Sequence, residues 1–274
     1  RNGHCPGRPA SEHRIMAAGR VIYKAVIAYE GSEYGGFQKQ INALGIQEVI
    51  EKALSAIHKY PSSVTASGRT DAKVHALGQV IHFEGRENMS EQGYYNALNT
   101  MLPKDVRVLS VRRMPADFHA RFSARAKHYD YIYTLDKDNP FTWRYKTPLK
   151  RQPDLEKMRQ AAAYLTGEHD FTAFSNAQIH PDKPRVKTIY RVDIAQEGKD
   201  IRFSWYGNGF LRYQVRMMTA AILNAGMGKY PPEYVKEMLD SRDKELCRWN
   251  APAQGLYLVK VYYEEDLNTA DFLA

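Results

Sequence analysis

The sequence passes twice through the same order of predicted elements, and this repeat limits the possible folds more than any other feature. Residues 21–29 are β-branched and aromatic and stop at Glu-Gly-Ser, which is typical of a strand. Apolar residues then recur at helical spacing from Ile46 to Ile57. The first half continues with strands at 62–67 and 75–84, a helix at 94–102 that stops at Pro103, and a strand at 106–114. Its order is therefore β-α-β-β-α-β.

The second half repeats this order. Its predicted elements are a strand at 128–135, a helix at 155–165, strands at 188–195 and 201–207, a helix at 211–222, a short helix after Pro231 and Pro232, and a strand at 255–263. Two such units predict an α+β protein of two ferredoxin-like (RRM-like) halves, each an antiparallel sheet with helices on one face. If the sheets join edge to edge into one long sheet, we expect the uncovered faces to form one concave platform.

Domain boundaries follow from the repeat and from the first residues of the chain. Residues 1–15 contain Gly, Pro, Arg and His without apolar periodicity, and Met16 follows at once. We expect this segment to be a disordered leader or foreign to the native chain. The N-terminal half then spans 16–125, and the C-terminal half spans 126–274 and completes an active-site cleft.

A basic zone crosses the boundary between the halves. The chain has a formal net charge of +8 and a pI near 9.3, and residues 104–151 contain twelve Lys and Arg against five Asp. The zone also contains the aromatic residues Phe118, His119, Phe122, Tyr129, Tyr131, Phe141 and Trp143. Cations among aromatic rings favour an RNA-binding surface, with phosphate contacts and faces for stacking. The alternative is a set of solvated loops and half-buried strand aromatics.

No metal site, disulfide framework or membrane span is predicted. The two cysteines, Cys5 and Cys247, cannot supply a thiolate cluster, and the nine histidines show no HxxxH or HExxH spacing. No apolar run approaches the ~20 residues of a membrane helix. We therefore expect a cytoplasmic protein without a metal.

The motif that indicates chemistry is SGRTDAKVHALGQV at residues 67–80. It is a glycine-containing turn between two predicted strands, and it presents Arg69 and Asp71 two residues apart. From these residues alone, the arginine and the carboxylate can equally well pair with each other or cap the turn.

Five motifs in order resemble those of the TruA-type tRNA pseudouridine synthases, over roughly residues 20–264. Residues 67–80 resemble the GRTDAGVHA…GQV signature, and residues 29–40 resemble YDG…GWQ.Q. The other three matches are FHARFSA…Y.Y at 118–133, GFL…MVR at 208–216 and APA.GLYL at 251–258. The resemblance implies the fold described above and no cofactor.

The resemblance also implies a reaction and its residues. Pseudouridine forms when the N1–C1′ bond of a uridine breaks, the uracil rotates and C5 rejoins the ribose. Asp71 takes the place of the catalytic carboxylate, either attacking C1′ or removing the C2′ proton, and both routes stay open. Arg216 matches the arginine that pairs with this carboxylate, and Arg69 the arginine that holds the flipped base. Tyr129 matches the tyrosine that stacks on uracil, and Leu256 the apolar residue across the pocket.

Further residues are expected to bind RNA. Arg121 and Arg125 are expected to contact phosphates, and Gln38 belongs to the second matching motif. Lys73 stands where the family usually has Gly, and Phe37 where it often has Trp. We expect a phosphate contact from Lys73, and a lysine here argues against a strict requirement for positive φ.

The implied function is conversion of uridine to pseudouridine in the anticodon stem-loop of tRNA, at positions 38–40, by a homodimer. A family paralogue acting on another RNA or position is an alternative. A non-catalytic RNA-binding protein is less favoured, because no RNP1-like string occurs in either half. A glycoside hydrolase usually needs a pair of carboxylates, whereas the motif supplies only Asp71.

Overall fold

A computed structural model describes residues 20–176 and 184–273, so residues 1–15 lie outside the described part of the chain. The first half contains β1 (Arg20–Tyr29), α1 (Ile46–His58), β2 (Thr65–Ala66), β3 (His75–Arg86), α2 (Glu91–Met101) and β4 (Val106–Met114). This is the predicted order. The expected strand at 62–67 is reduced to the two residues of β2.

The second half also follows the predicted order, with short additions. It contains β5 (Ala126–Thr134), β6 (Thr147–Pro148), α3 (Leu155–Ala163), β7 (Gly167–Asp170), η1 (Thr172–Phe174), β8 (Val186–Glu197), β9 (Asp200–Gly207), α4 (Gln214–Gly226), α5 (Glu233–Ser241), η2 (Ala253–Gly255), β10 (Leu256–Tyr262), η3 (Glu264–Thr269) and η4 (Asp271–Leu273). The helix expected from residue 211 begins only at Gln214, because Tyr213 before it has a left-handed backbone with φ of 67°. None of the described helices is long and apolar enough to cross a membrane.

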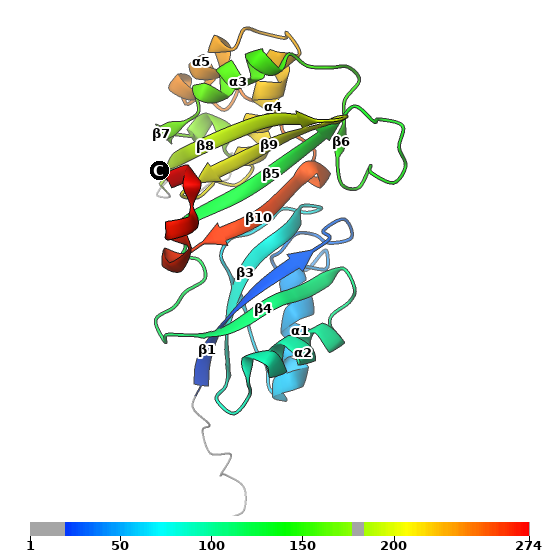
Figure 1. Cartoon of the computed structure of the whole chain (residues 1–274), viewed down its shortest axis with the longest axis vertical. Helices are drawn as coiled ribbons and strands as arrows, with labels where there is room; N and C mark the ends of the chain where they lie inside the picture. The colour runs from blue at the N-terminus through cyan, green and yellow to red at the C-terminus, as the bar shows by residue number, and fades with distance from the viewer. Residues whose placement is uncertain (1–19, 177–183, 274) are drawn as a thin grey trace, which may run out of the picture.

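The strands form one continuous sheet in the order β4-β1-β3-β10-β5-β9-β8-β7 (Figure 1). Both β2 and β10 pair with β3. Thr65 of β2 lies opposite His82 of β3 in an antiparallel pairing, and Leu258 of β10 lies opposite Ala76 of β3 in a parallel pairing. Because β2 is so short, the start of β3 stays available for β10. The expected joining of two ferredoxin-like sheets into one is confirmed.

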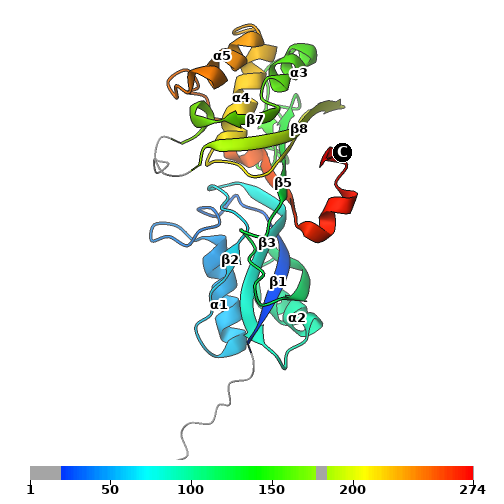
Figure 2. The same ribbon diagram turned by 90° about the vertical axis from the view of Figure 1, so that its left-hand side faces the viewer.

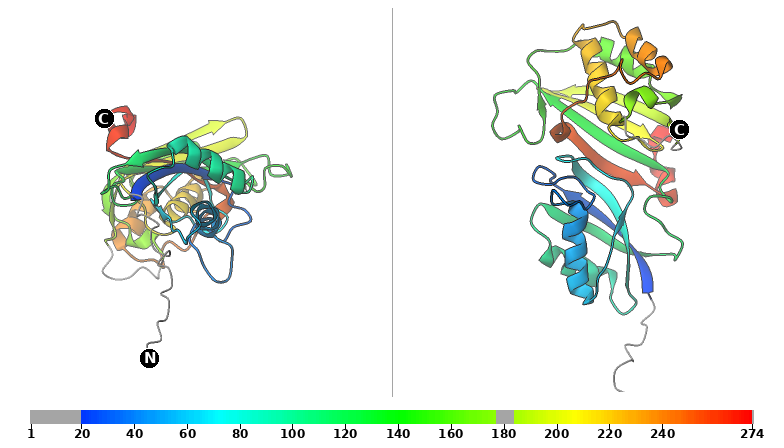
Figure 3. Two further views of the ribbon diagram at one scale, coloured as in Figure 1. Left: turned by 90° about the horizontal axis from the view of Figure 1, so that it is seen from below. Right: turned by 180° about the vertical axis from the view of Figure 1, so that it is seen from behind.

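The helices pack on one face of this sheet, which we call the helix face. In the first half Tyr94 of α2 contacts Tyr23 of β1, with ring centroids 4.7 Å apart. In the second half Trp205 Nε1 of β9 donates to Thr219 Oγ1 of α4 at 3.1 Å. Seen from behind, α1 and α4 lie in front of the sheet (Figure 3). Buried side chains of both halves form one connected core.

The opposite face, which we call the outer face, differs from the expectation of an uncovered platform. The segment after β10 folds back over it, so that η3 and η4 lie across the sheet from α4 (Figure 2). Ala270 and Phe272 of this segment are buried against Ala126 and Tyr262. Apolar side chains on the outer face of the second half therefore already have a cover.

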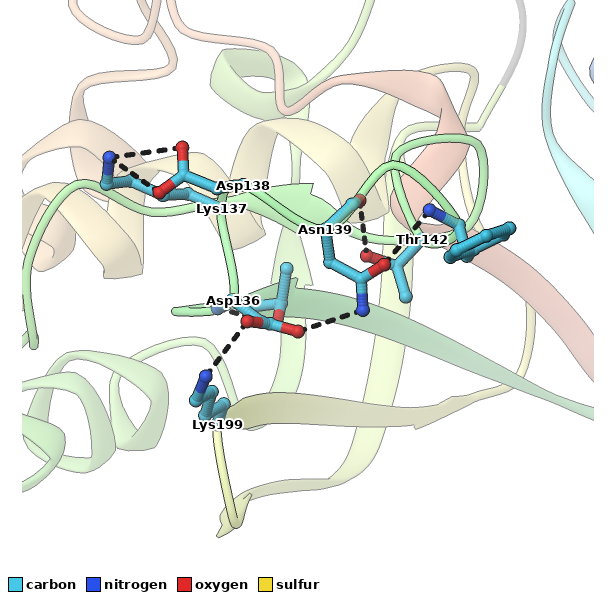
Figure 4. Close-up of polar contacts among 8 residues, drawn as sticks. Asp136, Lys137, Asp138, Asn139, Thr142 and Lys199 are labelled. Carbon is cyan, nitrogen blue, oxygen red and sulfur yellow. Dashed lines mark hydrogen bonds and ion pairs between the residues drawn. The ribbon is translucent and has the colours of Figure 1, made fainter.

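The loop between β5 and β6 is pinned by its own polar side chains (Figure 4). Asp136 accepts hydrogen bonds from Asn139 Nδ2 and Lys199 Nζ, both at 2.9 Å. Asn139 Oδ1 in turn accepts from Phe141 N at 3.0 Å. The loop leaves the rings of Phe141 and Trp143 exposed. Among the aromatic residues of the basic zone, these two and Phe122 are available at the surface, whereas Phe118, Tyr129 and Tyr131 are buried.

Candidate active site

The loop that carries Asp71 joins β2 to β3 and is braced from below by buried polar side chains. Tyr29 and Thr70 share a hydrogen bond of 2.7 Å between their hydroxyl oxygens. Gln79 Nε2 donates to the carbonyl of Gly68 at 2.9 Å, and Ser67 Oγ donates to Gln79 Oε1 at 2.8 Å. These contacts fix both ends of the 68–71 turn, so its two charged side chains project from a rigid base.

The segment 31–37 packs directly against this loop. Phe37 N donates to Thr70 O at 3.1 Å, and Lys73 N donates to Tyr34 O at 3.2 Å. A Cβ built on Gly31 would lie 2.0 Å from the Val74 carbonyl oxygen, so only glycine permits this approach. The motif at 29–40 thus supports the Asp71 loop from behind.

Lys73 corrects one expectation. Its φ is 66°, so the lysine occupies the left-handed region that the sequence argument considered less probable. The hydrogen bond from its backbone N–H to Tyr34 holds it in this conformation. A family preference for glycine here is explained by the backbone angle, which disfavours any Cβ. The Lys73 side chain is exposed.

Asp71 lies between two arginines, Arg212 in the turn before α4 and Arg216 in the first turn of α4. Arg216 Nη1 donates to Asp71 Oδ2 at 3.3 Å, and Arg212 Nε lies 3.7 Å from Asp71 Oδ1. Arg216 is itself oriented by a 2.7 Å hydrogen bond from its Nε to Ala251 O, in the APA motif. Its side chain is 13% exposed and that of Arg212 is 57% exposed. Arg216 is therefore the closer and better shielded partner.

Burial raises the pKa of Asp71, while Arg216 and then Arg212 act to lower it. Desolvation disfavours the charged carboxylate, and nearby cations favour it. The two arginines thus limit the rise in the pKa of Asp71 and favour its ionised form.

Tyr129 lies near Asp71 on the helix face, and Leu256 lies on the same face of the neighbouring strand β10. Both are buried, and Leu258, directly opposite Tyr129, shares a face with Leu256 two residues earlier on β10. Phe210 meets the Tyr129 ring edge-on, with centroids 5.3 Å apart. Burial, followed by the neighbouring Tyr29 and Asp71, raises the pKa of Tyr129, so its hydroxyl stays protonated. An apolar wall therefore stands next to the carboxylate.

Arg69 and Gln38 are exposed, and neither side chain has a hydrogen bond or ion pair within the described residues. Asp71 therefore pairs with Arg216 and Arg212 and not with Arg69. The simple reading of the RTD turn, in which its arginine and aspartate pair with each other, is wrong.

A cluster of cations lies next to the Asp71 loop. Lys127 Nζ donates to Ser67 O at 2.8 Å, and burial, followed by Arg121 and Lys187, lowers its pKa to about 8. Burial and Arg121 also lower the pKa of Lys187. Arg121, Lys127 and Lys187 have no acidic partner in the part of the chain that the structure describes. By contrast, Arg125 pairs with Glu264 at 2.9 Å.

Arg212, Lys127 and Lys187 were not identified from the sequence. Arg212 precedes Arg216 by four residues, a spacing that would have suggested a shared direction. Lys127 lies two residues before Tyr129 along β5, and the period of two in a strand would have placed the two side chains on the same face. Lys187 lies on a strand distant in sequence, and no local signal pointed to it.

The site lies on the helix face, at the junction of the halves, and not on the outer face. The reason is that Arg216 belongs to α4, which covers the helix face, and Asp71 must reach it from the β2–β3 loop. Within residues 20–176 and 184–273, no group of three His, Cys, Asp or Glu could hold a metal ion. The arrangement offers a carboxylate paired with two arginines, an apolar wall and nearby cations for an anionic substrate.

Comparison with known proteins agrees with this geometry. A family described as tRNA pseudouridine synthase matches residues 25–123 and 161–264. Proteins named tRNA pseudouridine synthase A from Exiguobacterium sp. and Oceanobacillus iheyensis are 42% identical over 242 and 247 residues; these matches cover 88% and 89% of this chain and 98% of each relative. One from Listeria innocua is 42% identical over 246 residues, covering 88% of this chain and 99% of the relative.

A crystal structure of a Cbf5-Nop10-Gar1 complex has a TM-score of 0.35 at 11% identity, covering 73% of this chain and 45% of that chain, which is too low to inform the fold. The matches cover nearly the whole length of these relatives, and the family match includes the Asp71 loop and the helix that carries Arg216. The chain belongs to the tRNA pseudouridine synthase family.

Proposed function

We propose that this chain converts uridine to pseudouridine in tRNA and that Asp71 is the catalytic carboxylate. The observation that carries the proposal is the position of Asp71, held 3.3 Å from Arg216 beside the Tyr129 ring where the two halves meet. The reaction moves a glycosidic bond from N1 to C5 of the same uracil, so it consumes no second substrate. A single ionised carboxylate beside the ribose suffices, by attack on C1′ or by removal of the C2′ proton.

The target uridine must leave its stack to reach Asp71, at a cost on the order of a few kcal/mol. Exposed Arg69 is placed two residues from Asp71 and can support the extruded nucleotide. Tyr129 supplies a ring beside the base, and Leu256 supplies apolar surface near it. We assign Arg121, Lys127 and Lys187 to the phosphates around the flipped nucleotide, because an anion would relieve the mutual repulsion of these cations. Lys73 and Gln38 are assigned to RNA further from the reacting atoms.

The proposed substrate is the anticodon stem-loop, with uridines at positions 38–40, and the proposed assembly is a cytoplasmic homodimer. The similarity to proteins named tRNA pseudouridine synthase A supports tRNA as the substrate. Pseudouridine mapping of total tRNA from cells with and without the protein would test the position. Loss of pseudouridine elsewhere, with 38–40 intact, would assign the chain to another site. Sedimentation equilibrium would test the dimer.

The catalytic assignment is tested by Asp71→Asn, which keeps the size of the side chain but cannot act as nucleophile or base. We expect tritium release from C5-labelled uridine in tRNA to fall by roughly a thousandfold or more, with tRNA affinity retained. The matched control is Asp136→Asn, in the β5–β6 loop, where Asp136 pairs with Lys199. Turnover within tenfold of the unmodified protein for Asp71→Asn would refute the assignment.

A further inference from the structure

The segment of residues 264–273 lies on the outer face as a covering strap. It follows β10, an interior strand of the sheet, and folds back over the outer face, where its residues contact β5, β9 and β8 (Figure 1, red). This is the face opposite Asp71 and α4. Its residues have no part in the proposed reaction.

The strap matches the outer face in charge. Four of its carboxylates pair with four cations of the sheet and its flanks. The pairs are Glu264 with Arg125 at 2.9 Å, Glu265 with Lys24 at 2.7 Å, Asp266 with Lys260 at 3.4 Å, and Asp271 with Arg191 at 3.4 Å. Each acidic group thus occupies a position that a phosphate oxygen would suit.

The strap also matches the outer face in stacking. The Phe272 ring stacks on Tyr206 with centroids 4.8 Å apart and 26° between planes, and it meets the Tyr262 ring edge-on at 4.9 Å. Tyr206 is further stacked on His128, at 4.2 Å, and covered by the Arg191 guanidinium, at 4.7 Å. Phe272 therefore lies where an unstacked base would lie on an aromatic strand residue.

The strap is weakly attached. The six residues of η3 bury no side chain, and Glu264 and Asp271 are 74% and 78% exposed. Ion pairs as exposed as these contribute little to stability. The stronger contacts of the strap are the burial of Phe272 and Ala270 and the Glu265–Lys24 pair, in which Lys24 is 11% exposed, so few contacts must break for the strap to leave the sheet.

We propose that the outer face of the C-terminal half is a second binding site, for single-stranded RNA, and that residues 264–273 cover it by imitating a nucleotide chain. RRM-like sheets bind single strands by stacking bases on strand aromatics. On the outer face of the C-terminal half, the aromatic side chains around the strap include Tyr206, Tyr262 and His128, and Tyr190, whose ring centroid lies 5.9 Å from that of Phe272. Release of the strap frees Arg191 and Lys260 on this face and Lys24 and Arg125 beside it, while Asp130 still pairs with Arg202 and Asp193 with Arg191. A splayed single strand suits this face better than a duplex, because duplex bases are not available for stacking.

The first test measures binding of a fluorescein-labelled octauridylate by anisotropy at several salt concentrations. A chain ending at Tyr263 should bind it about tenfold more tightly than the full chain, with a steeper dependence on salt. Adding Tyr206→Leu to that shortened chain should remove the gain, because the stacking face is lost. Unchanged affinity after shortening, or a gain that survives Tyr206→Leu, would overturn the proposal.

The second test keeps the full chain, in case the shortened chain fails to fold. Glu264→Gln with Glu265→Gln removes two of the ion pairs and should tighten octauridylate binding severalfold. The control, Glu233→Gln with Glu237→Gln on the exposed side of α5, changes the net charge equally and should leave affinity within twofold. An equal gain in both variants would mean that net charge alone acts. Because the readout is binding on the face opposite Asp71, its failure would not bear on the proposed catalysis.

Discussion

Arg216 reaches Asp71 across 145 residues of sequence, with 3.3 Å between its Nη1 and the carboxylate Oδ2. A helix of the second half thereby completes a site whose carboxylate comes from the first half. The same guanidinium holds Ala251 O through its Nε, so its position is fixed from two sides. The contact makes the pKa of Asp71 depend on how the halves are joined.

Arg216→Met should slow turnover by roughly two orders of magnitude and shift the acid limb of the pH–rate profile to higher pH. The ionised carboxylate is the reactive form, so the rate falls as pH drops through its pKa. Burial already raises that pKa, and removal of Arg216 removes the largest opposing effect. Single-turnover rates on tRNA across pH 5 to 9 would measure the shift. Arg212→Met is the control and should shift the acid limb of the profile less, because Arg212 is largely exposed. If Arg216→Met left the acid limb where it is, the pairing of Arg216 with Asp71 would be contradicted.

Lys73→Gly should raise the free energy of unfolding by about 0.5–1 kcal/mol, because glycine adopts a φ of 66° without the Cβ clash. The same change should weaken tRNA binding and reduce the slope of log K against log salt by about one unit or less. Urea denaturation and anisotropy titrations would measure the two effects. Lys104→Gly, in a turn where φ is not positive, should instead lower stability slightly. Lower stability in Lys73→Gly would mean that its side chain makes a stabilising contact.

Lys127→Met should change the pH dependence of stability. The folded pKa of Lys127 is lowered to about 8, so between that pH and its ordinary value of 10.5 the unfolded chain binds the extra proton. The stability of the unmodified protein therefore gains from this group as pH rises through that window, and the substitution removes the gain. Thermal unfolding should show that the melting temperature of the variant, relative to that of the unmodified protein, is lower at pH 10 than at pH 7. A constant difference would mean that the lysine titrates normally.

Arg121→Ala should weaken tRNA binding and lower the salt slope by roughly 0.7–0.9 units, as expected for the loss of one phosphate contact. Arg125→Ala should have a smaller effect, because Arg125 already pairs with Glu264 and a phosphate would have to displace that carboxylate. Filter-binding titrations at four salt concentrations would separate the two. Equal losses would indicate that the Glu264 pair opens when RNA binds.

The sequence by itself determined the two β-α-β-β-α-β units, because alternation and helical spacing are local properties of the chain. Ile46, Ile50 and Leu54 specified α1, and the alternating apolar residues of 201–207 specified β9. Asp71 and Arg216 were singled out by the resemblance of their short motifs to those of a known family, which can be seen without knowledge of the fold.

Only the tertiary structure decided what these residues meet. Lys127 and Lys187 come from separate strands, and their convergence on Arg121 depends on strand order, which periodicity does not encode. The strap on the outer face required the chain to fold back onto β8, and the composition of residues 264–273 alone carried no sign of this partner. The left-handed backbone of Lys73 was set by the Tyr34 carbonyl, a contact between loops 39 residues apart that overrides the local preference of a lysine. Local sequence patterns therefore identify the elements and the motif residues. The partners of these residues depend on long-range packing, because contacts between distant segments form only when the complete sheet has assembled.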